Sequence, residues 1–168
     1  GGRLAARHAI DALGIECGPI LSGPRGEPLT NTKVSLSISH KSNTAVAIVA
    51  KRQHGTLGID IEERHPERSG ISTRILTENE LVDIEDLEPS RKWISILKRF
   101  SAKESIYKAL APTQNRYIGF EEAEIFPIVN GHLQIRLFLK KNPIPAHISG
   151  RFFWNHDHLI TTIRASWK

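Results

Sequence analysis

The pentapeptide Gly58-Ile59-Asp60-Ile61-Glu62 is the stretch that best defines the fold of this chain. Side chains alternate across a β-strand, so Asp60 and Glu62 share one face while Ile59 and Ile61 occupy the other. Two carboxylates on one face repel each other unless a cation joins them, and hard oxygen ligands favour magnesium, manganese or calcium. The alternative is an edge strand whose acidic face is exposed to solvent.

A second candidate group lies on a long helix that the hydrophobic spacing predicts over residues 91–110. One stripe of that helix carries Leu97, Phe100, Ser101, Glu104 and Lys108. Glu104 is thus expected on the core side, where an ionised carboxylate is costly unless it is paired or bound to a metal. Its candidate partners are Lys108, one turn later, and the metal expected at Asp60 and Glu62. The alternative is an exposed Glu104–Lys108 pair, which stabilises a helix by about 0.2–0.5 kcal/mol.

The chain is predicted to begin with a helix and to continue with strands. A helix over residues 3–13 should end at Gly14 and lead into a stretch rich in glycine and proline. Strands are expected at 35–39, 44–50, 57–62, 123–128, 132–139, 151–154 and 158–166, with a hairpin turn at Asn130-Gly131. The strand at 44–50 is almost entirely apolar, which predicts burial on both faces. Its likeness to residues 159–165 has two open explanations, a weak internal duplication and the general similarity of buried strands.

The middle of the chain is predicted to be helical. Thr77 and Glu80 have the spacing of a capping box, which predicts a helix over residues 78–88. Pro89 should end that helix. The following long helix should stop before Pro112, because proline cannot donate the backbone hydrogen bond that a helix interior requires.

Size and composition are compatible with an enzyme but exclude few functions. At 168 residues the chain can form one domain, or two small halves that share a core. Lys and Arg number 23 against 18 Asp and Glu, and the resulting charge of +5 favours anionic partners. The single cysteine, Cys17, cannot form an intramolecular disulfide, and no apolar run reaches membrane-spanning length. We expect a cytoplasmic protein. Residues close to Gly1 already have helical spacing, so we also expect that the chain starts inside a larger protein or domain.

Two further segments carry side chains suited to phosphate binding. Ser37-Ile38-Ser39-His40 ends a strand with hydroxyl and imidazole groups, and the loop over residues 23–28 combines glycines with Arg25. Each has an ordinary structural explanation as well, since His40 is one of eight histidines and such loops are commonly plain turns. The chain contains no Walker loop, no dinucleotide-binding glycine motif, no nucleophile elbow and no zinc-spaced His or Cys pair.

These segments occur in an order that resembles a known family. The strand end at Ser39-His40 is followed by Gly58–Glu62 and then by the helical stretch Phe100-Ser-Ala-Lys-Glu-Ser-Ile-Tyr-Lys108. This order is similar to that of the Sfp and EntD type of phosphopantetheinyl transferases. The EntD-like branch in particular is indicated by Gly2-Arg3 through Arg7, by the glycine–proline loop and by Tyr117-Ile-Gly-Phe120.

The resemblance implies an α/β (α+β) fold with pseudo-twofold symmetry. Two similar sheet-plus-helix halves would enclose coenzyme A and magnesium in the cleft between them, in a monomer that mimics a dimer. The N-terminal half, residues 1–62, would bind coenzyme A and be incomplete at its start, and residues 63–168 would form the C-terminal half. The family branch has further basic residues before the Gly-Arg segment, so the adenine pocket is expected to be incomplete.

The same resemblance implies roles for individual residues. Magnesium, with manganese as the alternative, would be held by Asp60, Glu62 and Glu104. The catalytic residues would be Glu104, Lys108 and His40, with Lys108 and His40 at the diphosphate and Glu104 as base, metal ligand or both. The expected contacts to coenzyme A are Arg3, Arg7, Arg25, Gly26, Glu27, Pro28, Ser39, His40, Asp60 and Lys108.

The implied activity is that of a holo-[acyl-carrier-protein] synthase type of transferase. It would move the phosphopantetheine arm of coenzyme A to a serine of an acyl or peptidyl carrier protein and release adenosine 3′,5′-bisphosphate. The sequence does not distinguish carriers of siderophore, polyketide, nonribosomal peptide or fatty acid synthesis, and no nucleic acid or membrane partner is expected. The alternatives are another metal-dependent phosphoryl-transfer enzyme, an inactive homologue that only binds carriers, and, least favoured, a basic nucleic-acid-binding module.

Overall fold

The computed structural model describes residues 1–68 and 70–167 of the chain. Its helices and strands are α1 Gly2–Ala12, β1 Leu21–Ser22, β2 Pro28–Leu29, β3 Val34–Lys41, β4 Thr44–Lys51, β5 Thr56–Glu63, α2 Ser72–Ile75, α3 Glu78–Asp83, α4 Pro89–Gln114, β6 Ala123–Pro127, β7 His132–Leu137, β8 His147–Asn155 and β9 His158–Ser166. Short 3₁₀ turns lie at Arg52–His54, Phe120–Glu122 and Val129–Gly131. The mixture of helix and sheet confirms the expected α+β class.

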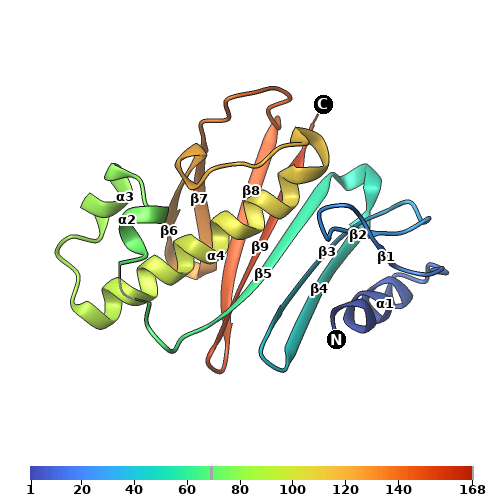
Figure 1. The fold of residues 1–168 in the computed structure, drawn as a ribbon, viewed down its shortest axis with the longest axis horizontal. Helices are drawn as coiled ribbons and strands as arrows, with labels where there is room; N and C mark the ends of the chain where they lie inside the picture. Colours follow the sequence, from blue (N-terminus) through green and yellow to red (C-terminus); the bar gives the residue numbers. More distant parts are fainter. Residues whose placement is uncertain (69, 168) are drawn as a thin grey trace.

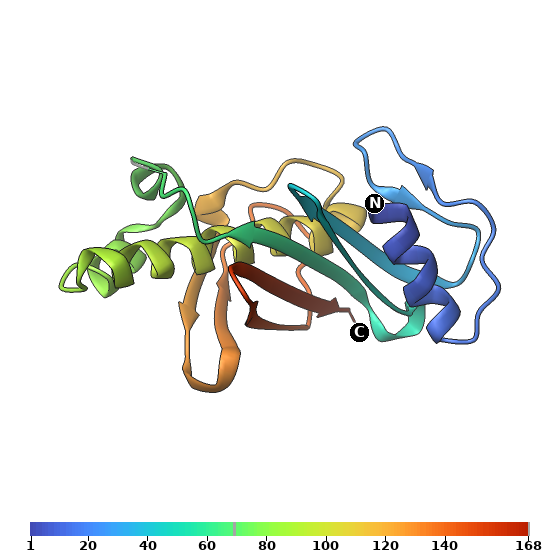
Figure 2. The same ribbon diagram turned by 90° about the horizontal axis from the view of Figure 1, so that it is seen from below.

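The strands form one large sheet and two small ones. The large sheet has the antiparallel order β5-β9-β8-β7-β6, while β3 pairs with β4 and β1 pairs with β2. Helix α4 lies across one face of the large sheet, and α1 covers the β3–β4 hairpin at the other end of the molecule (Figure 1). The view from below in Figure 2 shows β5 between these two parts. Backbone hydrogen bonds join β5 to β9, and its other edge lies beside β3.

Each end of the molecule has its own apolar core. Under α4 the core includes Ile106, Ile125 and Ile163, and under α1 it includes Ala6 and Ile10. Each part therefore contains an antiparallel strand pair, β3–β4 or β5–β9, with one helix packed against it. This arrangement agrees with two sheet-plus-helix halves. The predicted division after residue 62 remains a prediction, and the pairing of β5 with β9 joins that strand to the C-terminal sheet.

The prediction for the two middle helices is wrong in length. Helix α3 ends at Asp83 instead of residue 88, because turns at the following residues bring both Ile84 and Leu87 to one core cluster. Helix α4 begins at Pro89, a position where proline's missing N–H is not needed. It continues through Pro112 to Gln114, since a proline in the last turn costs one hydrogen bond and the αL residue Asn115 sets the actual end.

Strand β4 is not buried on both faces as predicted. Every residue from Thr44 to Ala50 is half-buried. The side that carries Ala47 and Val49 packs under α1, and Val46 and Ile48 on the other side pack against the cluster of β5 and β9 isoleucines. Both faces therefore have apolar partners, but within the described residues β4 pairs only with β3, so burial stays incomplete.

The remaining local predictions agree with the structure. The first helix spans Gly2–Ala12, and the Thr77–Glu80 capping box forms with both of its hydrogen bonds. The β6–β7 connection places Asn130 and Gly131 at positive φ, as a tight hairpin requires. In the part of the chain that the structure describes, no helix is long and apolar enough to cross a membrane.

Candidate active site

Strand β5 carries the acidic residues into the centre of the molecule. Asp60 and Glu62 are buried on one face, while Ile59 and Ile61 pack on the other face against Ile160. Both the shared face of the two carboxylates and the opposite placement of the isoleucines are confirmed. The alternative of a solvent-exposed acidic face is wrong, because α4 and β3 both pack against β5.

Gly58 permits this close packing of β5 against α4. A Cβ atom at Gly58 would clash with the backbone carbonyl of Ser105 and lie 2.9 Å from the backbone nitrogen of Ala109. Since those atoms belong to the helix backbone, they cannot move aside cheaply. The glycine therefore sets the distance between the strand that carries Asp60 and the helix that carries Lys108.

Asp60 is held by donors from two other elements. Its Oδ1 accepts hydrogen bonds from Ser39 Oγ of β3 at 3.0 Å and from Lys108 Nζ of α4 at 2.9 Å. Its Oδ2 accepts one from Ser101 Oγ at 2.9 Å. Lys108 also donates to Ser39 Oγ and to the Ile59 carbonyl, each at 2.9 Å. These contacts satisfy a buried charge and fix the ammonium group of Lys108 beside β5.

Glu62 is paired with two cations. Its Oε2 lies 2.8 Å from Lys41 Nζ at the end of β3 and 3.1 Å from Arg68 Nη2 in the segment after β5. Lys41 and Arg68 are about one-third exposed, so the cations lie at the surface side of a buried carboxylate. The pairing explains how Glu62 stays buried next to Asp60.

Glu104 completes the acidic group from α4. The side chain is half-buried, and no described residue donates a hydrogen bond to its carboxylate. Burial, followed by the charges of Asp60 and Glu62, raises the pKa of Glu104, while Lys108 and Arg68 act in the opposite direction. The prediction that Glu104 faces inward is confirmed, and the structure places it in the electrostatic field of both strand carboxylates. We call Asp60, Glu62 and Glu104 the acidic cluster.

Serine side chains join β3 to β5 where no backbone ladder connects them. Ser35 Oγ donates to the Gly55 carbonyl at 2.5 Å, Ser37 Oγ accepts from the Ile59 amide at 3.1 Å, and Ser39 bonds Asp60. The three serines alternate along β3 and so point to the same side. Ser39, expected to contact coenzyme A, is thus buried within the contact between β3 and β5.

The acidic cluster suits a hard divalent cation in the type of its donors. Three carboxylates supply oxygen ligands, the donor type that such ions prefer, and burial together with the charges of Asp60 and Glu62 raises the pKa of Glu104. Among the described residues, however, no three His, Cys, Asp or Glu side chains are close enough together to form a metal-binding group. Lys108 holds Asp60, and Lys41 and Arg68 hold Glu62, so the carboxylates are directed to these cations.

Lys103, which precedes Glu104, is a structural residue. It is buried and donates to Glu80 Oε2 and the Ile75 carbonyl, each at 2.7 Å, and to the Phe120 carbonyl at 2.9 Å. Burial lowers the pKa of Lys103, against the effect of its bond to Glu80. These bonds anchor α2, α3 and the segment before β6 to α4. Lys103 is therefore structural, while its neighbour Glu104 belongs to the acidic cluster.

The basic residues expected at coenzyme A lie in two places. Arg25 Nη2 donates to Asn115 Oδ1 at 2.8 Å, which brings the loop over residues 23–28 to the C-terminal end of α4. In that loop Gly26 has φ +82°, and Glu27 accepts a hydrogen bond from the Arg25 amide at 2.9 Å. Pro28 begins β2.

The second place is the α1 side of β3. Arg3 of α1 donates to Ser22 Oγ at 2.5 Å, and Arg7 is exposed on the same helix. His40 is exposed and, by alternation along β3, points away from the side of Ser39 and Lys41. The structure therefore brings Asp60, Lys108 and Ser39 together but not His40 with them.

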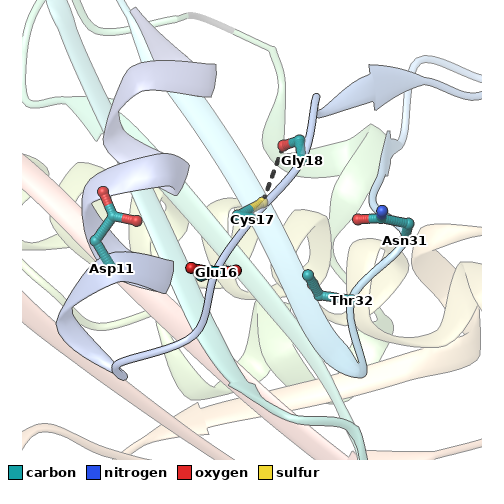
Figure 3. Close-up of a pocket in the computed structure, with 6 residues that line it drawn as sticks. All are labelled: Asp11, Glu16, Cys17, Gly18, Asn31 and Thr32. Carbon is teal, nitrogen blue, oxygen red and sulfur yellow. Dashed lines mark hydrogen bonds between the residues drawn. The ribbon is translucent and has the colours of Figure 1, made fainter.

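The structure contains a small cavity beside Glu104 and a larger hollow beside α1. A cavity of about 120 Å³ adjoins the acidic cluster and is lined by Lys103, Glu104, Ile106, Tyr107, Tyr117, Ile118, Gly119, Phe120 and Ala123. A larger hollow of about 550 Å³ lies beside α1 and is lined by Asp11, Glu16, Cys17, Gly18, Asn31 and Thr32 (Figure 3). Asp11 and Glu16 are exposed there. Their negative charge would repel phosphate groups, so the larger hollow does not suit an anionic substrate.

Two models of known protein families match this chain. A family model described as the 4′-phosphopantetheinyl transferase superfamily matches residues 56–163, and a model of the 4′-phosphopantetheinyl transferase N-terminal domain matches residues 1–50. The chain belongs to the 4′-phosphopantetheinyl transferase superfamily. The first match contains the complete acidic cluster together with Lys108, and the second contains Ser39 and Lys41.

Curated relatives agree with the family membership. The chain is 36% identical over 125 residues to 4′-phosphopantetheinyl transferase PptT of Mycobacterium tuberculosis, covering 73% of this chain and 54% of the relative. It is 35% identical to Svp of Streptomyces mobaraensis, with 73% and 51% covered. It is 30% identical to enterobactin synthase component D of Salmonella typhimurium, with 96% and 68% covered. The chain thus spans about half the length of the first two relatives.

Solved structures of this superfamily share the fold. Holo-[acyl-carrier-protein] synthase of Thermotoga maritima aligns with a TM-score of 0.54 at 21% identity, covering 67% of this chain and 63% of that one. The synthase of Bacillus anthracis, solved in complex with CoA (3′,5′-ADP), aligns with a TM-score of 0.55 at 21% identity, covering 67% and 96%. At this identity the likeness establishes the fold.

Three residues that contact the acidic cluster were not predicted from the sequence. Ser101 binds Asp60, and Lys41 and Arg68 bind Glu62. Ser101 lies on the same helix stripe as Glu104, so helical spacing could have indicated it. Lys41 lies two residues after Ser39 on the same strand face, so strand alternation could have indicated it. Arg68 carried no such periodic signal, because it belongs to an irregular segment.

Proposed function

We propose that the protein is a magnesium-dependent 4′-phosphopantetheinyl transferase that moves the phosphopantetheine arm of coenzyme A to a carrier-protein serine. The observation that carries the proposal is the buried contact of Asp60 with Lys108, next to Glu62 and Glu104. An acidic cluster beside a fixed ammonium group can hold a metal and a diphosphate side by side. Family membership supports the same reaction.

Asp60, Glu62 and Glu104 would hold the magnesium ion. When bound, the metal supplies positive charge to the diphosphate oxygens, where negative charge increases as the leaving group departs. Lys108 adds a second positive contact from the protein itself. The Lys108 side chain is about one-quarter exposed, while Asp60, Ser39 and Ile59 fix the position of its ammonium group.

Glu104 is the proposed general base. Its carboxylate accepts no hydrogen bond from the described residues, which leaves an oxygen free to take a proton, and in the metal-free protein burial raises its pKa. In the proposed step the carrier serine Oγ bonds to the β-phosphorus of coenzyme A. The bond from that phosphorus to the bridging oxygen breaks, the serine proton passes to Glu104, and adenosine 3′,5′-bisphosphate leaves.

The remainder of coenzyme A would extend along α4. Asn115, which holds Arg25, lies seven residues beyond Lys108, a rise of about 10 Å along a helix. Arg25 and the backbone of Gly26–Pro28 would therefore meet the adenosine 3′-phosphate while Lys108 meets the diphosphate. Arg3, Arg7 and His40 are further proposed contacts. The small, mostly apolar cavity beside Glu104 suits part of the slender pantetheine arm.

The carrier protein would approach on the Glu104 side. Carrier proteins are commonly acidic, and the net charge of +5 favours their encounter with this chain. The proposal covers carriers of siderophore, polyketide and peptide synthesis alike.

Intact-mass spectrometry tests the function. Several apo carrier proteins are incubated with this chain, coenzyme A and magnesium, and transfer adds about 340 Da to the carrier. Asp60→Asn should abolish the adduct. Asp157→Asn should retain it, because that side chain is largely exposed and makes only a 3.8 Å ion pair with Arg64. A folded protein that modifies no carrier in the panel would overturn the proposal.

A further inference from the structure

Glu62 is the only member of the acidic cluster that the described structure pairs with two cations from two different segments. Lys41 and Arg68 both contact the same oxygen, Oε2, at 2.8 and 3.1 Å. Lys41 ends β3 in the N-terminal part, and Arg68 lies in the segment that follows β5. Glu62 therefore joins two basic side chains that are otherwise unconnected.

Arg68 is held in this position by aromatic rings as well as by charge. Its guanidinium carbon lies 4.6 Å from the centroid of the Phe100 ring and 5.9 Å from that of Trp93. Both rings belong to α4. Stacking on aromatic faces restricts a guanidinium group without satisfying its hydrogen-bond donors. Arg68 is thus a positioned cation whose other N–H groups remain accessible to an anion.

The charges of the site balance within the protein. The acidic cluster contributes three negative charges, and Lys41, Arg68 and Lys108 contribute three positive ones. A divalent cation that joins the cluster would leave two positive charges in excess. A diphosphate group carries the complementary charge. The net charge of the site is consequently zero without ligands and zero again with metal and diphosphate together. With the metal alone, the site has an excess of two positive charges.

We propose that Lys41 and Arg68 form a counter-cation lock on Glu62 that makes metal binding depend on the diphosphate. The inference rests on the proposed function and adds a coupling between the two ligands of its site. With a metal held at Glu62, the side chains of Lys41 and Arg68 would leave this carboxylate and bind phosphate oxygens of the substrate. Because coupling between two ligands is reciprocal, coenzyme A strengthens metal binding by the same factor as the metal strengthens coenzyme A binding.

Binding of Mn²⁺, measured by electron paramagnetic resonance of the free ion, tests the lock without using activity. The variants are Lys41→Gln, Arg68→Gln and the double variant, each titrated with and without coenzyme A. Removing one nearby positive charge should tighten binding of Mn²⁺ alone by about tenfold. The increase in Mn²⁺ affinity that coenzyme A causes should be large in the wild type and small in the double variant.

Matched variants control for the loss of charge elsewhere. Lys51→Gln removes a lysine from the far end of the same hairpin, and Arg91→Gln removes an exposed arginine from the start of α4. Both should bind Mn²⁺ as the wild type does. If Arg68→Gln does not fold, Lys41→Gln still provides the comparison.

The outcomes separate the lock from the function. Carrier modification by the wild type, together with Mn²⁺ affinities that are equal in wild type and lock variants, would overturn the lock and leave the transferase proposal standing. Absence of Mn²⁺ binding in every protein, with or without coenzyme A, would also overturn the lock. Absence of carrier modification alongside the expected Mn²⁺ affinities would instead count against the transferase proposal.

Discussion

Lys108 Nζ lies 2.9 Å from Asp60 Oδ1, and this ion pair joins α4 to β5 at the centre of the molecule. The same ammonium group reaches Ser39 of β3, so one lysine connects the three elements that carry the site. Lys108 therefore holds α4, β5 and β3 together and also supplies a positive charge to the site.

Lys108→Gln should therefore impair transfer more than folding. We expect transfer to fall by about 100-fold or more, because the variant loses the proposed positive contact to the diphosphate. Asp60 would keep its bonds from Ser39 and Ser101, so the fold should persist. Carrier modification rates and circular dichroism measure the two effects. Lys141→Gln, at an exposed lysine, is the control, and equal rates in both variants would contradict the assigned role.

Glu104→Gln should reduce activity while stabilising the protein at neutral pH. The raised pKa means that the folded state binds a proton at Glu104 more strongly than the unfolded state does. Stability from this group is present at pH values below the ordinary glutamate pKa and is lost as pH rises through the folded value. Glutamine has no proton to lose, so the variant should keep this stability at pH values above the folded pKa of Glu104.

Urea unfolding between pH 4 and pH 8 measures this effect, and transfer should fall by about 100-fold if Glu104 is the base. Glu85→Gln, an exposed glutamate, should change neither quantity. A Glu104→Gln variant less stable than the wild type at pH 7 would show that the carboxylate makes favourable contacts that the structure does not contain.

Gly58→Ala should disrupt the contact between β5 and α4. The new Cβ meets backbone atoms of Ser105 and Ala109, and overpacking against backbone costs about 1–3 kcal/mol or more. We expect a lower free energy of unfolding and reduced transfer, because Asp60 and Lys108 move apart. Gly18→Ala is the matched control, since the nearest atoms to its Cβ would belong to the Asn31 side chain and not to backbone. Equal unfolding midpoints for the two variants would contradict the close approach.

Glu122 should contribute stability that disappears in acid. Arg116 donates to both of its carboxylate oxygens at 2.8 and 2.7 Å, and this bond is the main reason that the pKa of Glu122 is lowered to about 2. A lowered pKa gives stability that is fully present above the ordinary glutamate pKa and is lost as pH falls toward the folded value. The stability advantage of the wild type over Glu122→Gln should therefore shrink from pH 5 to pH 2.5. Urea unfolding checks this, and a constant difference would refute it.

Local sequence patterns predicted most of the secondary structure and the faces of the key side chains. The opposite placement of Asp60 and Ile61, the inward direction of Glu104 and the Thr77 cap all follow from periodicity over a few residues. Predictions failed where neighbours decided the result. Pro112 lies within α4 because Asn115 ends the helix, and β4 is half-buried because its pairing and covering depend on other elements.

By itself, the sequence determined that two carboxylates share a strand face and that a third faces inward from a helix, since alternation and helical repeat are properties of the local backbone. Only the tertiary structure decided which cation meets which carboxylate. Lys41 and Glu62 are separated by 21 residues along the chain, and Ser39 and Lys108 by 69. No local pattern encodes such contacts, because they arise from the packing of β3, β5 and α4, in which Gly58 permits the close approach of the helix.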